Sequence, residues 1–166
     1  MTDTLLNRTI TYSGLSTSEY LKSFEKEIQK NITLEALTIH LTADNNYHTE
    51  KPYLYRRIIK STDRRFEGFE IVHDKSEKIH VIVFDLKITL SELENLFGKP
   101  FMQNEPYDEA TAFAFKSTNP DIEIIKTRHP KWLTKIKDKL YEYSVDNNSY
   151  KLVDPEFSFV QFSIKQ

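Results

Sequence analysis

The stretch Lys78–Gly98, KIHVIVFDLKITLSELENLFG, contains the features that decide the fold. Its first part, Lys78–Leu86, predicts a strand. Because Val81–Phe84 is apolar on both faces, we expect this strand at the centre of a sheet and covered on both sides. Its second part predicts a helix, since Thr89-Leu-Ser-Glu92 has the spacing of a capping box, and Gly98 is a natural residue to end it.

Two further helices are expected on either side of this stretch. Ser16-Thr-Ser-Glu19 is a second capping box, and it predicts a helix that ends near residues 30–31. After Pro130, the helical spacing of Trp132, Ile136 and Leu140 predicts a third helix. We expect further strands at 37–41, 53–60, 66–73, 110–116 and 121–127, a loop at 43–52, and a closing hairpin of 150–153 with 157–164.

The chain of 166 residues is long enough to bury one core and has no obvious linker. Helices and strands alternate without a strict βαβ rhythm. The sequence therefore predicts a single α+β domain, residues 1–166, in which an antiparallel or mixed sheet packs against about three helices. Residues 1–15 are expected to form an extended N-terminal arm.

Composition excludes several classes of function. With no cysteine, the chain has no disulfide, Cys-ligated zinc, iron–sulfur cluster or thiol nucleophile. With three glycines it has no Gly-rich phosphate loop and no GxSxG elbow. No secretory signal or membrane-spanning apolar stretch is present, so we expect a cytoplasmic protein with no membrane partner and no cofactor. The oligomeric state stays open.

Asp85 and Lys87 follow the apolar run with two-residue spacing, which places both on one face of the strand. An acid two residues before a Lys, between a buried strand and a helix, resembles the core of restriction-type nucleases of the PD-(D/E)xK group. The resemblance implies acids that hold a divalent metal and a Lys that helps to activate water. Glu70 or Asp74 would be the partner acid and Glu19 an additional one. The family's preceding Pro-Asp is absent from this stretch.

Histidines offer a weaker metal hypothesis. His73 and His80 flank the expected hairpin and could face each other across it, with Asp74 or Asp85 as a further ligand. No tight histidine pair or zinc motif supports this, and the more common outcome is a half-exposed polar side chain. The sequence therefore predicts no metal site.

Two segments are rich in basic residues and favour nucleic-acid binding as an alternative function. The first contains Arg56, Arg57, Lys60, Arg64 and Arg65. The second, residues 126–139, contains Lys126, Arg128, Lys131, Lys135, Lys137 and Lys139. Interleaved aromatic side chains would suit single-stranded nucleic acid. A pI near 6.2 is low for a dedicated nucleic-acid-binding protein, however, and the lysines also fit an ordinary solvated helix face.

The loop Asn104-Glu-Pro-Tyr-Asp-Glu109 places an exposed Tyr among carboxylates. A basic protein partner could be steered by Glu105, Asp108 and Glu109 and anchored by Tyr107. Strong folding signals with weak chemical ones favour a non-enzymatic protein-binding domain. A small inhibitor or immunity-type protein, which neutralises a partner by charge and shape complementarity, fits this description.

Overall fold

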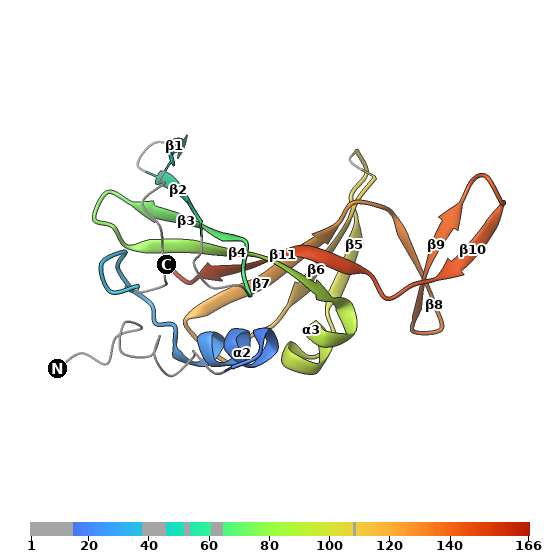
Figure 1. Ribbon diagram of the computed structural model, residues 1–166, viewed down its shortest axis with the longest axis horizontal. Coiled ribbons are helices and arrows are strands. Elements are labelled where there is room, and N and C mark those ends of the chain that lie inside the picture. Colours follow the sequence, from blue (N-terminus) through green and yellow to red (C-terminus); the bar gives the residue numbers. More distant parts are fainter. Residues whose placement is uncertain (1–14, 38–45, 52–53, 61–64, 108) are drawn as a thin grey trace.

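The computed structural model describes residues 15–37, 46–51, 54–60, 65–107 and 109–166. Within these ranges the chain is mostly β, with two antiparallel sheets and only two short helices (Figure 1). The helices and strands of the first half are α2 (Thr17–Glu27), β1 (Asn46–Lys51), β2 (Leu54–Lys60), β3 (Gly68–Asp74), β4 (Ile79–Thr89) and α3 (Leu90–Phe97). Those of the second half are β5 (Phe101–Asn104), β6 (Thr111–Phe115), β7 (Ile122–His129), β8 (Leu133–Ile136), β9 (Lys139–Ser144), β10 (Ser149–Leu152) and β11 (Glu156–Ile164).

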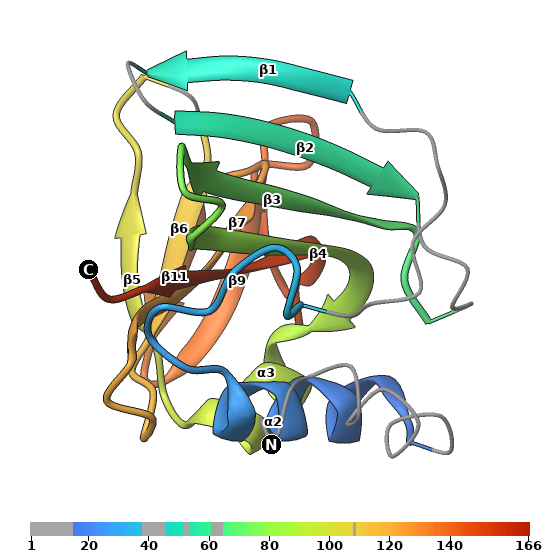
Figure 2. The same ribbon diagram turned by 90° about the vertical axis from the view of Figure 1, so that its left-hand side faces the viewer.

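The large sheet has eight strands in the order β1-β2-β3-β4-β11-β7-β6-β5. It curves over α2 and α3, which both lie on one of its faces (Figure 2). The small sheet has three strands in the order β10-β9-β8 and extends away from the rest of the molecule (Figure 1). We call the face of the large sheet that points away from the helices the outer face.

The core lies between the large sheet and the helices. Phe84 on β4 is its centre, with ring centroids 4.9 Å from Phe24 on α2 and 5.5 Å from Phe162 on β11. Phe66 and Phe69 complete the cluster at 5.4 and 5.2 Å from Phe84. Edge-to-face and tilted contacts of this kind add to the stabilisation from burial alone. The aromatic content of the sequence is thus used to fill a broad sheet–helix interface.

Both capping boxes predicted from the sequence are confirmed. The Ser16 hydroxyl accepts from the Glu19 amide at 3.2 Å, and the Glu19 carboxylate accepts from the Ser16 amide at the same distance. Thr89 and Glu92 repeat the arrangement at the start of α3. Gly98 ends α3 with a φ of 86°, a backbone conformation that glycine adopts at no steric cost. α2 ends at Glu27, slightly before the predicted boundary.

The prediction of an α+β fold with about three helices is wrong. The expected third helix is instead the hairpin of β8 and β9, joined by Lys137 and Asp138 at φ of 51° and 67°. Two residues with positive φ form the turn that matches the twist of a hairpin, but they are normally Asn and Gly. Because Lys-Asp lacks that signature, the sequence did not indicate a turn, and the spacing of the apolar residues predicted a helix.

Three other predictions for the strands need correction. Residues 46–51, expected in a loop, form the edge strand β1. The closing hairpin does not form, because β10 pairs with β9 while β11 inserts between β4 and β7. β4 is central as predicted, but only one face is fully buried: Ile82 and Phe84 are inaccessible, whereas Val81 and Val83 are half-buried on the outer face. The predicted arm, apart from Leu15, and most of the predicted 37–41 strand lie outside the described residues.

Candidate functional site

Asp85 and Lys87 lie on the outer face of β4, as their spacing predicted. Gly68 on β3 stands opposite Asp85, where an added Cβ would come within 2.8 Å of the Ile59 carbonyl oxygen and 3.4 Å of Asp85 Oδ2. Glycine therefore allows β2, β3 and the carboxylate to come this close. Burial raises the pKa of Asp85, and the negative charges of Glu70 and Glu67 raise it further.

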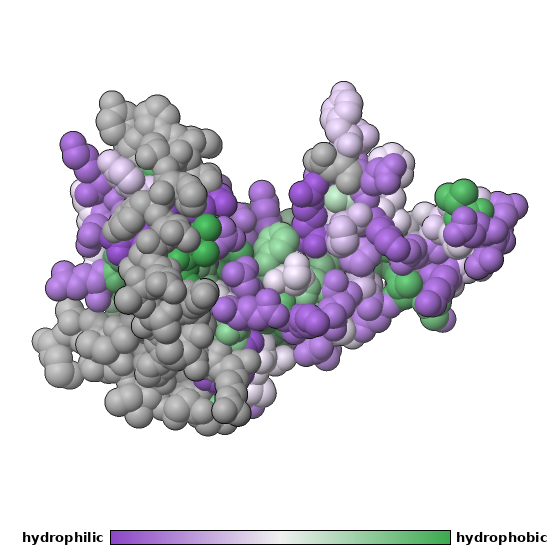
Figure 3. Space-filling model, turned by 45° about the horizontal axis from the view of Figure 1, so that its top comes forward, coloured by the Kyte–Doolittle hydropathy of each residue, from purple (hydrophilic) through white to green (hydrophobic). Residues whose placement is uncertain are grey.

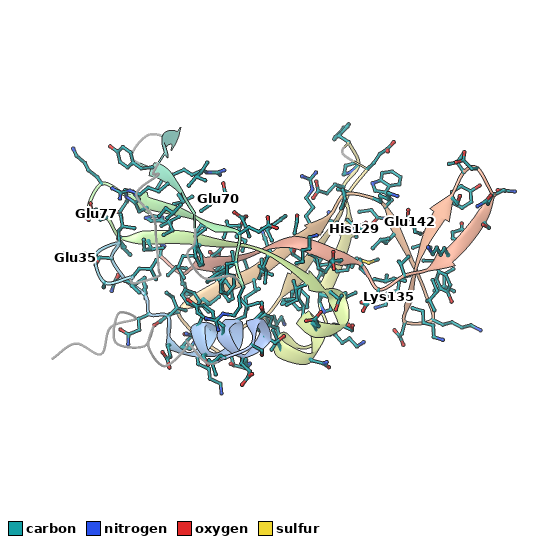
Figure 4. The ribbon with its side chains drawn as sticks, viewed as in Figure 1. Glu35, Glu70, Glu77, His129, Lys135 and Glu142 are labelled. Carbon is teal, nitrogen blue, oxygen red and sulfur yellow. The ribbon has the colours of Figure 1, made fainter. Side chains whose placement is uncertain are left out.

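Of the partner acids in the nuclease hypothesis, only Glu70 lies near Asp85. Glu70 lies across from Val83, on the face away from the helices (Figure 4), and it pairs with Arg56 at 3.3 Å. Asp74 lies in the turn at the other end of the β3–β4 hairpin. Glu19 caps α2 on the opposite side of the sheet. No group of three His, Cys, Asp or Glu side chains within the described ranges could hold a metal ion.

The two histidines of the β3–β4 hairpin bond to different groups. His73 Nδ1 lies 2.8 Å from the backbone oxygen of Asp74, and its ring stacks on Tyr55. His80 Nε2 lies 3.1 Å from Asp74 Oδ2. Burial alone would raise the pKa of Asp74, but the His80 contact and the backbone amides of Lys78 and Ser76 together lower it. These contacts of Asp74 and the two histidines stabilise the turn between β3 and β4.

The first basic segment does not form a continuous cationic surface in the described part of the chain. Arg56 and Arg57 are neighbours on β2 and so point to opposite faces, and Arg56 binds Glu70. Arg65 donates to the Leu15 carbonyl at 2.5 Å and lies over the Tyr20 ring, 4.9 Å from its centroid. Arg64 and the side chain of Lys60 lie outside what the structure describes.

The second basic segment extends from β7 through the connection to β8, β8 itself and the following turn to the first residue of β9, since no helix forms here. Several of its charges are compensated by acids. Arg128 pairs with Glu105 at 3.0 Å, and Lys131 pairs with Glu142 at 2.6 Å. Hydrogen bonding from Lys131 lowers the pKa of Glu142. The geometry therefore gives little support to a nucleic-acid groove along residues 126–139.

The acidic loop joins β5 to β6, and its predicted anchor is open to solvent. Tyr107 is 94% exposed and Glu109 is also exposed, whereas Asp108 lies outside the described residues. Glu105 is only partly available, because its carboxylate binds Arg128 and its backbone oxygen accepts from Trp132 Nε1 at 2.8 Å. The loop is thus held against the start of the small sheet.

The small sheet carries an apolar face that sequence reasoning missed. In its register Tyr143 lies opposite Tyr150, and Tyr141 opposite Leu152, so these four side chains share one face. The two rings of the Tyr143–Tyr150 pair are 5.2 Å apart, and both side chains are about half exposed. The alternation of Tyr141, Glu142 and Tyr143 was the available signal, but it lay inside the segment interpreted as a helix.

Exposed apolar side chains are concentrated at this end of the molecule. Of the nine large ones in the described ranges, only Ile58 lies elsewhere. The other eight belong to the small sheet, to β5 and its loop, or to the connection before β8: Phe101, Tyr107, Trp132, Ile136, Tyr143, Val145, Tyr150 and Leu152. Hydrophobic surface on the small sheet is visible at the right of Figure 3. We call these eight residues the distal surface.

A buried hydroxyl fixes the small sheet to the large one. Thr111 Oγ1 on β6 accepts from the Leu133 amide at 3.0 Å and lies 2.8 Å from Asn104 Oδ1 and 2.9 Å from the Lys131 carbonyl oxygen. Glu142 and His129 lie at the same junction (Figure 4). Burial lowers the pKa of His129, which favours the neutral form of its ring. The distal surface is therefore presented in a defined orientation.

A groove of about 590 Å³ opens between the two sheets. Its apolar walls come from α3, β5, β6 and the small sheet, and they include Leu90, Met102, Phe113, Leu140 and Val153. Lys99 and Glu94 pair at 3.1 Å on its rim, as do Lys135 and Asp138 at 3.8 Å. The size is within the usual range for binding pockets.

Comparison with known proteins gives no match: no family model, no curated protein and no solved structure is significantly similar to this chain. In the described part of the chain, no helix is long and apolar enough to cross a membrane. The site is therefore defined by its geometry alone, and its most distinctive feature is the distal surface.

Proposed function

We propose that the chain is a non-enzymatic protein-binding domain that contacts its partner through the distal surface. One observation carries the proposal: eight of the nine large exposed apolar side chains of the described residues lie on the small sheet, on β5 and its loop, or in the connection before β8. A cluster of exposed apolar side chains, in contrast to scattered ones, is typical of an interaction site. Tyr and Trp are also the residues most often found as energetic anchors of protein interfaces.

The acidic loop extends this surface. Tyr107 projects beside Glu109, and both belong to the loop that Trp132 holds in place. Carboxylates at the edge of an apolar patch speed the encounter with a basic partner and select against acidic ones. A small inhibitor or immunity-type protein would use a surface of this kind, and the lack of cysteine fits action in the reducing cytoplasm.

Affinity capture from the organism of origin tests the proposal. The full chain is compared with the double variant Tyr143→Ser and Tyr150→Ser, and with Ile58→Ser, a matched control that removes a large exposed apolar side chain outside the distal surface. We expect a protein that the wild type and the control retain and that the double variant loses. If the double variant and the wild type retain the same proteins in equal amounts, the distal surface is not the binding site.

A further inference from the structure

The strand β5 is a short edge of the large sheet that lacks charged side chains. Edge strands expose unpaired backbone groups, and proteins normally guard them with charged residues. The sequences of the other three edge strands follow this rule, with Glu50 and Lys51 in β1, Lys135 in β8 and Lys151 in β10. β5 has the sequence Phe-Met-Gln-Asn and carries no charge.

The two faces of β5 differ in a way that suits a further strand. Met102 faces the core side and lines the groove together with its partner Phe113. Phe101 points to the outer face and is 71% exposed. A strand added beside β5 would place alternate side chains over Met102 in the groove and over Phe101 outside it.

The rim of the groove favours a negatively charged occupant. Asp154 is already used, because its carboxylate accepts from the Ser91 amide at 3.1 Å and from the Ser91 hydroxyl. Glu94 and Asp138 are paired with Lys99 and Lys135. Lys139, also on the rim, is exposed and forms no ion pair with any residue that the structure describes. Its ammonium group is therefore available to a carboxylate.

We propose that β5 and the adjacent groove bind an extended segment of the partner protein by strand addition. The segment has apolar residues at alternate positions, one of which enters the groove, and an acidic residue that reaches Lys139. Strand addition gives affinity through backbone hydrogen bonds and specificity through side-chain pockets. This inference rests on the proposed function, since it assigns the mode by which part of the partner is held.

Selection of random linear peptides displayed on phage, with the full chain as bait, supplies the probe. The binding of a selected, fluorescently labelled peptide is then measured by anisotropy. Met102→Lys places a charge on the edge and in the groove, and we expect it to weaken binding by about tenfold or more, a loss of about 1.4 kcal/mol. Lys139→Glu removes the proposed ion pair between Lys139 and the acidic residue of the peptide. Because that pair is exposed, the change should weaken binding by up to about fivefold.

Matched controls lie outside β5, the groove and the distal surface. Ile58→Lys on β2 and Lys151→Glu on β10 introduce the same kinds of charge at exposed positions and should leave peptide affinity unchanged. Met102→Lys would also weaken binding if it impaired folding, so a second test is needed that does not depend on it. A peptide whose acidic residue is replaced by Lys should regain affinity for Lys139→Glu. Amide hydrogen exchange of the wild type should slow at 101–104 when peptide is added.

Several results would overturn the inference. Selected peptides could bind all variants equally, or protect β10 in place of β5. A second copy is the occupant if β5 becomes protected without peptide as the protein dimerises at high concentration. The two proposals can fail separately: a partner that is lost from Tyr143→Ser with Tyr150→Ser, but retained by Met102→Lys and Lys139→Glu, disproves strand addition and leaves the proposed function intact.

Discussion

The large and small sheets are built from similar strands but are stabilised differently. In the large sheet, the central strand β4 buries one face against the helices, and its Phe84 makes five aromatic contacts. The three strands of the small sheet bury only Leu133 and Leu140. A three-stranded sheet is stable on its own only when it buries an apolar face or packs against a helix. The small sheet therefore depends on its junction with the large one, and its other face remains available for binding.

The largest expected effect is the loss of an aromatic ring from the core. Phe84→Ala leaves a cavity among four phenylalanine rings and should lower the free energy of unfolding by about 3–5 kcal/mol. Leu140→Ala, the matched change in the small sheet, should cost less because Leu140 borders the open groove. Chemical denaturation gives both free energies.

Hydrogen exchange then distinguishes local from global loss. Phe84→Ala should speed exchange throughout the large sheet, whereas Leu140→Ala should speed it mainly in β8, β9 and β10. Equal acceleration of both sheets by Leu140→Ala would show that they unfold as one cooperative unit, and the contrast between them would be wrong.

A smaller effect is expected at the junction. Thr111→Val keeps the side-chain shape but removes the acceptor of the Leu133 amide and the donor that serves Asn104 and Lys131. A buried polar group left without its partner costs about 1–3 kcal/mol. We expect this loss in thermal or chemical unfolding, with exchange faster at the start of β8. Thr134→Val, an exposed threonine on β8, is the control and should be nearly neutral.

Local signals in the sequence predicted local structure well. The capping boxes of Ser16 and Thr89 predicted both helices, and short apolar segments predicted β2, β3, β4, β6 and β7. Pairings between distant segments were not predictable in the same way. Nothing near β11 in the sequence indicates that it inserts between β4 and β7, because strand order depends on the packing of the whole sheet.

The candidate site was predicted only in part. The acidic loop around Tyr107 was expected from its composition, and the structure places it beside the small sheet. The apolar face of the small sheet was not predicted, because the turn between β8 and β9 was not predicted. Once Lys137 and Asp138 reverse the chain, Tyr141 and Tyr143 fall on one face of a strand, where helical spacing had placed them apart. An error in two residues thus concealed the apolar face of the small sheet.

The smallest expected effect is a change of stability with pH, and its direction differs between Asp85 in the large sheet and Glu142 in the small sheet. In the large sheet, burial and the neighbouring Glu70 raise the pKa of Asp85, whereas in the small sheet Lys131 lowers the pKa of Glu142. An acid whose pKa is raised by folding binds its proton more tightly in the folded state. Stability therefore falls as the pH rises from the usual pKa of Asp to the raised value, and the loss persists at neutral pH.

Asp85→Asn removes the ionisable carboxyl group and therefore the loss of stability that its ionisation causes. Because the carboxylate is half-exposed and partly screened, we expect the variant to be more stable than the wild type at pH 7 by up to about 1 kcal/mol. The two proteins should differ little at pH values below the usual pKa of Asp. Denaturation measured across this range checks the sign. A variant that is less stable than the wild type at pH 7 would show that the ionised carboxylate stabilises the outer face of the large sheet, which would remove the contrast with Glu142.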